Sequence, residues 1–243
     1  MIAHSGICLI PLLLFLLIVR CNAVQESTIG FEGFNAKNSH NRIALTFDDG
    51  PHGTLTPKLL DILKEKNVKV TFFVMGVKVA MHPDIIQRAH AEGHEIANHV
   101  WDHPVLSKIP RDSVKDQIER TNTAIRNAIA ITPKVMRPPY GNTNAKLNDF
   151  IYEEENLRVI LWSHDTNDWK RPPVSEIVTK TIPMVKSGTV ILCHDIHPGT
   201  IEAMPQLIDK LHEAGFKFAT VSKLIEMNNN SAHHKAHHHN LRG

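Results

Sequence analysis

Two adjacent carboxylates, Asp48 and Asp49, follow the apolar run at residues 42–47 and precede Gly50 and Pro51. Asp, Gly and Pro are ordinary turn residues, so a plain turn explains the pair when it is considered alone. The alternative is an active-site corner. A continued strand would point the two carboxylates in opposite directions, so that one binds a metal ion and the other acts as a base. Polar clusters farther along the chain favour this second interpretation.

The histidines His99 and His103 are four residues apart, which suits one side of a helical turn, while Pro104 suits a tight loop equally well. Two histidines and one carboxylate leave open positions on a metal ion, which is typical of catalytic rather than structural zinc sites. With Asp49 as the carboxylate, the three residues are candidate metal ligands. The alternative is a pair of surface histidines in a His-rich chain.

A further histidine, His194, follows the apolar run at 189–193 and stands beside Asp195. At the end of a strand it is a candidate general acid, and the alternative is a core histidine with satisfied hydrogen bonds. A metal ion makes water nucleophilic near neutral pH, and a nearby carboxylate can remove its proton. The set of residues therefore predicts metal-assisted hydrolysis.

The elements that must position these residues are strand-like runs that alternate with helical patterns, without an internal linker or repeat. In the helix expected at 55–65, for example, Leu59, Ile62 and Leu63 recur at helical spacing. Strands are expected at 43–47, 68–74, 94–97, 134–136, 157–162, 189–193 and 217–220. Helices are expected at 55–65, 83–91, 113–129, 145–154, 174–185 and 200–214.

This alternation predicts parallel strands joined by right-handed crossovers, in either an open doubly wound sheet or a closed barrel. The turn at 48–52 lacks the G-x-G-x-x-G pattern of a dinucleotide-binding sheet, which favours the barrel. An eight-fold barrel takes about 250 residues, so seven strands within 41–227 predict a distorted (β/α)7 barrel of the α/β class. Its active site is expected at the carboxyl ends of the strands, where the polar clusters lie.

The chain resembles the polysaccharide deacetylases of carbohydrate esterase family four, which share the NodB-homology domain. Five motifs carry the resemblance, in order: TFDDG at 46–50, HVWDH at 99–103, RPPYG at 137–141, DTNDW at 165–169 and LCH at 192–194. Together they span nearly the whole of residues 41–227. Each motif is modest by itself, but the ordered set is highly specific.

The resemblance implies a role for each polar motif residue. Asp48 would be the general base, oriented by Arg137. His194 would be the general acid, with its protonated form favoured by a hydrogen bond to Asp168. The implied ligands of a divalent metal, zinc foremost and cobalt as the alternative, are Asp49, His99 and His103.

The resemblance also implies substrate-binding residues. Tyr140 and Pro139 would both be substrate-binding residues, and Tyr140 would offer its backbone N–H to the oxyanion that forms in acyl transfer. Trp169 and Leu192 would line the acetyl pocket, although core packing is an alternative for Trp169. One departure is Val100, because the family usually carries Ser or Thr after the first metal histidine. We expect this change to alter metal affinity without abolishing activity. A second difference is the cysteine of the LCH motif, Cys193, which is expected to be a small apolar filler.

The predicted reaction is hydrolysis of N-acetyl groups from N-acetylglucosamine units of a β-1,4-linked glycan, with release of acetate. Chitin oligomers and peptidoglycan are the leading substrates, and O-acetyl xylan is possible on the same chemistry. The choice among these glycans is expected to depend on loops at Val77–Met81, Ser107–Asp112 and Lys170–Val174.

Two other classes of function compete with this prediction. A metal-independent glycosidase would use a pair of carboxylates, Asp48 with Asp165 or Asp168, but it leaves His99 and His103 unexplained. A non-catalytic glycan-binding module would be expected to lack at least one motif residue, and none is missing from the sequence.

The start of the chain is apolar from Ile7 to Val19 and then has Arg20 and a small-residue site ending at Ala23. This predicts a secretory leader at 1–23, since the run is too short to span a bilayer comfortably; a retained membrane anchor is the alternative. We expect an N-terminal extension at 24–40, a catalytic domain at 41–227, and a secreted or cell-wall-associated monomer without stable membrane insertion.

Cleavage after Ala23 would leave 26 basic and 25 acidic residues, which implies neither nucleic acid nor an acidic surface as a partner. It would also leave Cys193 as the single cysteine, so stability must come from a buried core. Residues 228–243 are expected to form a disordered tail, with metal capture as the alternative. The tail contains His233, His234, His237, His238 and His239.

Overall fold

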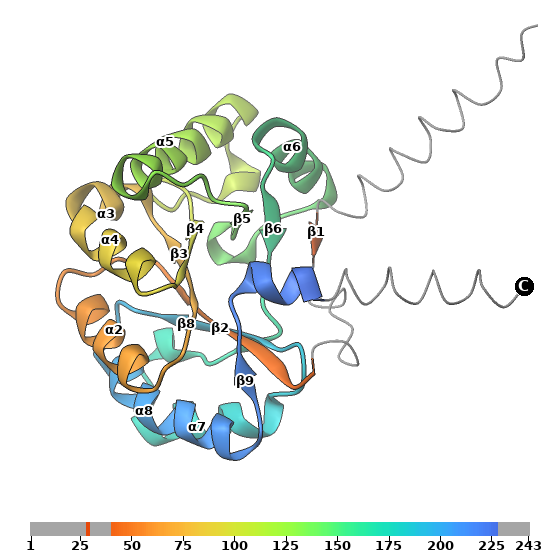
Figure 1. Ribbon diagram of the computed structural model, residues 1–243. Helices are drawn as coiled ribbons and strands as arrows, with labels where there is room; N and C mark the ends of the chain where they lie inside the picture. Colours follow the sequence, from red (N-terminus) through yellow and green to blue (C-terminus); the bar gives the residue numbers. More distant parts are fainter. Residues whose placement is uncertain (1–27, 30–39, 228–243) are drawn as a thin grey trace, which may run out of the picture.

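The computed structural model describes residues 28–29 and 40–227 (Figure 1). The expected leader at 1–23 and the expected tail at 228–243 lie outside the described residues, as does most of the expected extension at 24–40. Those domain boundaries, and the secretion that the leader implies, stay predictions. None of the helices in the described part of the chain has the length and apolar character that crossing a membrane requires.

The sheet has nine strands in the described residues: β1 (Thr28–Ile29), β2 (Arg42–Asp48), β3 (Thr71–Val74), β4 (Glu95–Asn98), β5 (Val135–Met136), β6 (Arg158–Ile160), β7 (His164–Asp165), β8 (Val190–His194) and β9 (Lys217–Phe218). The helices are α2 (Leu55–Glu65), α3 (Gly76–Met81), α4 (Pro83–Ala91), α5 (Arg111–Ile129), α6 (Ala145–Glu155), α7 (Val174–Thr181) and α8 (Pro198–Glu213). A last helical stretch at 221–227 follows β9. The 3-10 turns are η2 (Leu106–Lys108), η3 (Pro139–Gly141), η4 (Asp168–Lys170) and η5 (Ile182–Met184).

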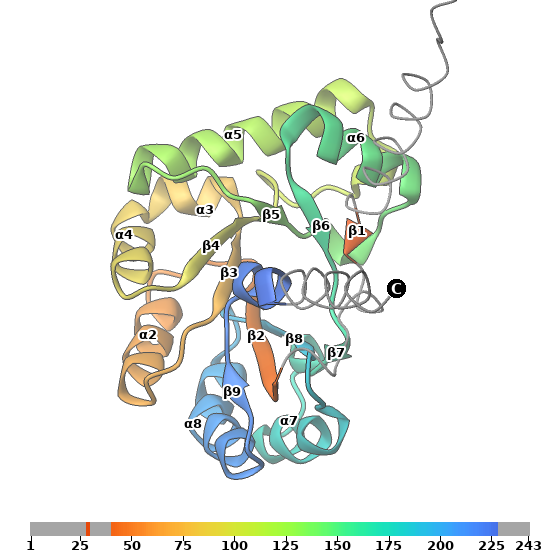
Figure 2. The same cartoon turned by 45° about the vertical axis from the view of Figure 1, so that its right-hand side comes forward.

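The strands pair in parallel in the order β1-β6-β5-β4-β3-β2-β8-β7, and β9 adds to β2. Figures 1 and 2 show that the sheet curls and that the helices pack around its outside. In the described residues β1 and β7 end the pairing path without meeting, so the barrel is incomplete. The predicted distorted (β/α)7 barrel of the α/β class is confirmed.

Strand β2 is covered on both faces, which explains its nearly continuous apolar sequence. Leu45 and Phe47 pack outward into the layer of helices, and Ala44 packs into the barrel interior. Because side chains alternate along a strand, Thr46 and Asp48 face inward with Ala44. The last inward position of this central strand is therefore a carboxylate.

The helical stretch at 221–227, here called the plug helix, closes one end of the barrel (Figures 1 and 2). Its Leu224 belongs to the same apolar cluster as the inward-facing Phe73 of β3. The backbone N–H of Val221 donates to Oγ1 of Thr71, 2.9 Å away, at the first residue of β3. The plug helix thus covers the amino ends of the strands, and the carboxyl ends stay available for a site.

Each of the seven predicted strands is present, with bounds that differ by a few residues, but two strands and two helices were not predicted. These are the short strands β1 and β7, the helix α3 and the helical stretch at 221–227. The predicted loop at Val77–Met81 is wrong, because this segment lies in α3, which is too short to produce a helical repeat in the sequence. The helix expected at 174–185 ends earlier, at Thr181, and Pro183 lies in the 3-10 turn η5.

Candidate active site

The carboxyl ends of the strands surround a cavity of about 430 Å³. It is lined by most of the predicted site residues: Asp48, Asp49, His99, His103, Tyr140, Trp169, Leu192 and His194. Arg137 and Asp168 lie directly behind the lining and bond to residues within it. Pro139 is buried beside Tyr140 and does not line the cavity.

Asp48 and His194 are register partners on the neighbouring strands β2 and β8. Both occupy the final inward position of their strand, so alternation of side chains brings the two groups to the same cavity. The preceding residue on β8, Cys193, points the other way and packs in the helix layer as a buried free thiol. The prediction that Cys193 is an apolar filler is confirmed.

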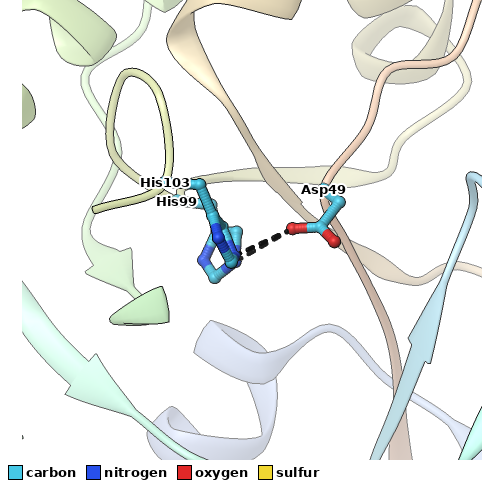
Figure 3. Close-up of side chains that lie close together, drawn as sticks. All are labelled: Asp49, His99 and His103. Atoms are coloured by element: carbon cyan, nitrogen blue, oxygen red, sulfur yellow. Dashed lines mark ion pairs between the residues drawn. The ribbon is translucent and has the colours of Figure 1, made fainter. Parts of the chain in front are cut away.

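The predicted metal ligands lie together (Figure 3). Oδ1 of Asp49 is 3.4 Å from Nε2 of His99 and 3.2 Å from Nε2 of His103. One ligand atom from each residue lies within 4.8 Å of the others, and this is the one such group found in the described residues. The two histidines stand on the loop that follows β4, so a loop rather than a helical turn produces their spacing.

The expectation that Asp48 and Asp49 point in opposite directions is wrong. The strand ends at Asp48, and Asp49 has a left-handed backbone with φ of 73°. This change of direction brings both carboxylates toward His99, whose Nε2 is 3.8 Å from Asp48 Oδ2 and 3.4 Å from Asp49 Oδ1. The two carboxylates therefore differ in the other groups that each one contacts, and not in the direction in which they point.

The donor set fits a divalent cation. Oδ1 of Asp49 is buried and has no hydrogen-bond partner among the described residues, which is costly for a carboxylate unless a cation or a donor faces it. Burial opposes the ionisation of Asp49, but His103 and His99 hold its pKa well below the usual range. Two imidazoles and one carboxylate are a common set of ligands for catalytic zinc.

The ring of His99 is held in one orientation by a hydrogen bond. Its Nδ1 lies 2.7 Å from the carbonyl oxygen of Arg137, which can only accept a hydrogen bond. Nδ1 therefore carries the proton, and Nε2 presents its lone pair toward Asp49. Such a partner fixes both the tautomer and the ring orientation of a ligand histidine.

Asp48 is held by the buried guanidinium of Arg137, whose Nη1 donates to Oδ1 at 2.6 Å. Arg137 also donates to Oγ1 of Thr46 and to the carbonyl oxygens of Ile160 and Leu161. Burial lowers the pKa of Arg137, and Asp48 opposes that shift. With Oδ1 committed to Arg137, Oδ2 is the oxygen of Asp48 on the side of His99.

His194 is held from behind by Asp168. Its Nδ1 lies 2.7 Å from Asp168 Oδ1, and its backbone N–H donates to Asp168 Oδ2 at 2.7 Å. Thr200 donates to the same Oδ2, so the carboxylate is fully bonded and the pKa of Asp168 is lowered in spite of its burial. Burial disfavours a charged His194, but Asp168, Asp48 and Asp49 outweigh it and raise the pKa of His194 to about 9.

Two aromatic residues form the rim of the cavity. Tyr140 is 68% exposed, has a left-handed backbone with φ of 60°, and places its ring against His103 with centroids 4.6 Å apart. Trp169 is 50% exposed, and its Nε1 donates to Oδ2 of Asp165 at 3.3 Å. This exposure excludes core packing as the sole role of Trp169.

The sequence interpretation missed two residues that line the cavity, Trp162 and His197. Trp162 lies at the end of a predicted strand, which is a detectable signal. His197 lies three residues after His194, with ring centroids 5.8 Å apart, and burial lowers its pKa. In the sequence, a histidine just before a predicted helix is equally well explained as a helix cap, so His197 could not be recognised as a cavity residue.

Comparison with known proteins places this site in a family. A family model described as polysaccharide deacetylase matches residues 35–160. The chain belongs to the polysaccharide deacetylase family. The resemblance noted from the five motifs is therefore confirmed.

Several relatives within this family carry named activities. The chain is 40% identical over 186 residues to a peptidoglycan-N-acetylglucosamine deacetylase of Listeria monocytogenes, which covers 76% of this chain and 39% of the relative. It is 36% identical over 204 residues to a chitooligosaccharide deacetylase of Bradyrhizobium, covering 75% of this chain and 90% of the relative. The chain thus spans about two fifths of the length of the Listeria protein and most of the Bradyrhizobium protein.

A solved structure agrees with the fold. The peptidoglycan deacetylase PdaC from Bacillus subtilis superimposes with a TM-score of 0.77 at 34% sequence identity, covering 83% of this chain and 98% of that chain. At this identity the likeness concerns the family as well as the fold.

Proposed function

We propose that this member of the polysaccharide deacetylase family is a metal-dependent hydrolase that removes N-acetyl groups from N-acetylglucosamine units of a β-1,4-linked glycan. The observation that carries the proposal is the meeting of three groups at one cavity. These are the ligand set around Asp49, the Asp48–Arg137 pair and the His194–Asp168 pair.

The cation would be held by Asp49, His99 and His103. We propose zinc, with cobalt as the alternative, because His₂-carboxylate sets with open positions suit catalytic zinc. When bound, the ion supplies Lewis-acid activation of water and of the acetyl carbonyl. Asp49 serves this task because its Oδ1 faces both imidazoles and has no hydrogen-bond donor of its own in the described residues.

Asp48 is the general base in this proposal. Arg137 holds Oδ1, which leaves Oδ2 to accept a proton from the attacking water. The water oxygen then bonds to the acetyl carbon. Since Arg137 is fully buried and bonded to four acceptors, it keeps the carboxylate in one orientation.

His194 is the general acid. Its raised pKa, about 9, keeps the imidazole protonated near neutral pH, and Nδ1 is committed to Asp168. Nε2 is then the atom that gives its proton to the amide nitrogen while the carbon–nitrogen bond breaks. The products are acetate and a free amine on the sugar, so the added water is fully accounted for.

The remaining predicted residues would bind the acetyl group and the sugar. The backbone N–H of Tyr140 is proposed as an oxyanion donor, supported by the left-handed turn that exposes this residue at the rim. Leu192 and Trp169 would enclose the methyl group, since both line the cavity and the Trp169 indole is tied to Asp165. Pro139 would act indirectly, by holding the turn that carries Tyr140.

For the substrate we propose peptidoglycan or chitin oligomers. The relatives are named for activity on peptidoglycan or on chitooligosaccharides, which supports an N-acetylglucosamine glycan without separating the two. O-acetyl xylan is the alternative on the same scaffold. Export through the leader at 1–23, action as a monomer and location at the cell wall or outside the cell complete the proposal.

The competing classes are less well supported. A glycosidase that uses Asp168 conflicts with the burial of that carboxylate behind His194 and its bond to Thr200. A glycosidase that uses Asp165 leaves the ligand set around Asp49 without a task. A glycan-binding module remains the alternative that acetate release must test.

The experiment measures acetate released from N-acetylglucosamine oligomers and from purified peptidoglycan, before and after chelation and with zinc restored. The assay uses a variant in which alanine replaces the tail histidines, so that residues 228–243 do not bind additional metal. Asp48→Asn is the matched variant; it should bind zinc while turnover falls about 10²- to 10⁴-fold. Release that chelator does not affect would refute metal dependence. Absence of release from these glycans and from acetylated xylan would favour the binding module.

A further inference from the structure

The loop that carries both histidine ligands, residues 99–103, is called the metal loop here (Figure 3). Two of its residues, Val100 and His103, have left-handed backbones with φ of 60° and 69°. This conformation is rare for residues other than glycine, and for a β-branched residue it is a genuine outlier. The loop therefore needs contacts from the surrounding structure to keep its shape.

One set of contacts comes from the start of α3. The backbone N–H of Gly76 donates to the carbonyl oxygen of Val100 at 2.9 Å, and that of Val77 donates to the carbonyl oxygen of Trp101 at 3.1 Å. A β-carbon at Gly76 would overlap the Trp101 ring and the hydroxyl of Thr121. The metal loop thus lies directly against the backbone of α3.

A second contact comes from the end of β4. Oδ1 of the buried Asn98 accepts the backbone N–H of Val100 at 2.7 Å. Its Nδ2 donates to the carbonyl oxygen of Ile118 and to Oδ1 of Asn122, both on α5. The first half of the loop is therefore fixed to β4 and, through Asn98, to α5.

In the second half of the loop, the side chain of Gln117 of α5 bonds the backbone of two consecutive residues. Its Oε1 accepts the backbone N–H groups of Trp101 and Asp102, at 2.9 and 3.2 Å. Its Nε2 donates to Oδ1 of Asp102 at 2.8 Å. One amide thus satisfies three groups of the two residues that immediately precede His103.

The two ligand histidines differ in their support. His99 is fixed through Nδ1 by the Arg137 carbonyl, whereas no hydrogen bond in the described part of the chain fixes Nδ1 of His103. The Tyr140 ring packs against His103, and the rest of the His103 position depends on the loop backbone, which Gln117 bonds at Trp101 and Asp102.

We propose that Gln117 is a positioning residue that sets the place of His103 relative to His99 and thereby the affinity of the metal site. The inference rests on the proposed function, because it takes Asp49, His99 and His103 to be metal ligands. Gln117 touches neither metal nor substrate. Its effect is transmitted through the backbone of residues 101–102.

The test exchanges the amide and the carboxylate of the hydrogen-bonded pair Gln117 and Asp102. Gln117→Glu keeps acceptors for the two N–H groups but sets a second carboxylate against Asp102, so zinc affinity should fall about 10- to 100-fold. Asp102→Asn alone keeps an acceptor for Gln117 and should bind zinc within about threefold of the original chain. In the double variant Q117E/D102N, the new asparagine amide donates to the new carboxylate, and affinity should return to within about threefold of the original chain.

Zinc affinity is measured by competition with a chromophoric chelator, in the chain whose tail histidines are alanine, and folding is checked by circular dichroism. Glu119→Gln is the matched control on the same helix, since its carboxylate is exposed and lies 3.9 Å from Nζ of the surface residue Lys115, away from the metal loop. It should leave zinc affinity unchanged. If Gln117→Glu does not fold, zinc affinity is measured for Gln117→Asn instead. This variant keeps the amide group, but its shorter side chain does not reach the loop backbone, so its zinc affinity should also fall.

The outcomes separate the two proposals. If the original chain does not bind zinc, the proposed function fails whatever Gln117 does. If the original chain binds zinc and the folded Gln117 variants bind it equally well, the positioning role is overturned. Weaker binding that the double variant does not restore would likewise refute the exchange between Gln117 and Asp102.

Discussion

Arg137 donates to Asp48 across 2.6 Å, and the two side chains are 0% and 5% exposed. Removing one partner of such a pair leaves a buried charge without compensation. We expect Arg137→Met to lower the free energy of unfolding by about 3–5 kcal/mol, measured by urea denaturation at pH 7. The double variant R137M/D48N should recover part of the loss, because the unpaired charge is removed too.

The control for this prediction is Arg126→Met on α5, where the exposed guanidinium donates only to Thr123 among the described residues. It should change stability by no more than about 0.5 kcal/mol. If Arg137→Met were as stable as the Arg126 variant, the pair would not be the buried support described above.

The second prediction concerns pH. The folded-state pKa of His194, about 9, is above its usual 6.5, so protonation of His194 stabilises the folded protein. This contribution is complete below about pH 6.5 and is lost as the pH rises through 9. Over that range the metal-free chain should lose about 3 kcal/mol of unfolding free energy relative to its His194→Gln variant.

The measurement is a series of urea denaturations of both metal-free proteins between pH 6 and pH 10. Asp168→Asn provides the matched control, because it removes the carboxylate that does most to raise the pKa of His194 while the histidine stays in place. Its stability should depend on pH in this range much less than that of the original chain. Parallel pH curves for all three proteins would contradict the prediction.

The third prediction concerns the residue after Asp49. A β-carbon on Gly50 would overlap the carboxylate of Asp195, which is fully buried and accepts a 2.5 Å hydrogen bond from Thr56. We expect Gly50→Ala to cost about 1–3 kcal/mol of stability through overpacking. It should also weaken zinc binding, since Asp49 must move with its neighbour.

The comparison variant is Gly199→Ala in the first turn of α8, where the new methyl group would lie 3.9 Å from Val174. This change should be neutral or stabilise by up to about 1 kcal/mol, because alanine favours helix. Thermal denaturation and zinc titration of the two alanine variants test the prediction. Equal stability and equal zinc affinity of the two variants would show that a methyl group at Gly50 fits beside the Asp195 carboxylate, and would contradict the prediction.

The fourth prediction concerns Cys193. Its thiol is fully buried in the helix-facing core, and burial raises its pKa well above the usual value. In a chain with serine at Cys8 and Cys21, we expect a thiol reagent such as Ellman's to leave Cys193 unmodified until urea unfolds the protein. Rapid modification of the native protein would contradict this placement.

Most of the fold could be predicted from the sequence because the main strands are apolar runs, which are stable only when both faces of the strand are buried. Strand β2 illustrates this, since it is buried on both faces and ends in a carboxylate at the barrel mouth. Pieces of two residues such as β1 and β7 carry no periodic signal, and they form because a neighbouring strand edge pairs with them. The helix α3 was missed for the related reason that six residues are too few for a repeat.

The site was predictable in its members but not in its geometry. The ligand set was indicated by residue type and spacing, yet the relative direction of Asp48 and Asp49 depends on a left-handed residue that strand alternation does not predict. Of the supports behind the site, Arg137 and Asp168 were expected from the family resemblance, whereas Gln117 and Thr200 were not. Gln117 and Thr200 lie on helices, where a polar residue is usually a solvated one, and only the packing brings them to the loop and to Asp168.

The position of the plug helix has a consequence for how the protein matures. Strand β2 is the first long strand in the described part of the chain, but its neighbours β8 and β9, and the plug helix under the barrel, come from the C-terminal end of that part. On the ribosome, the segment that holds Asp49, His99 and His103 therefore lacks its final packing until residues up to 227 have been made. The candidate metal site is thus completed by the part of the barrel that is synthesised after all three of its ligands.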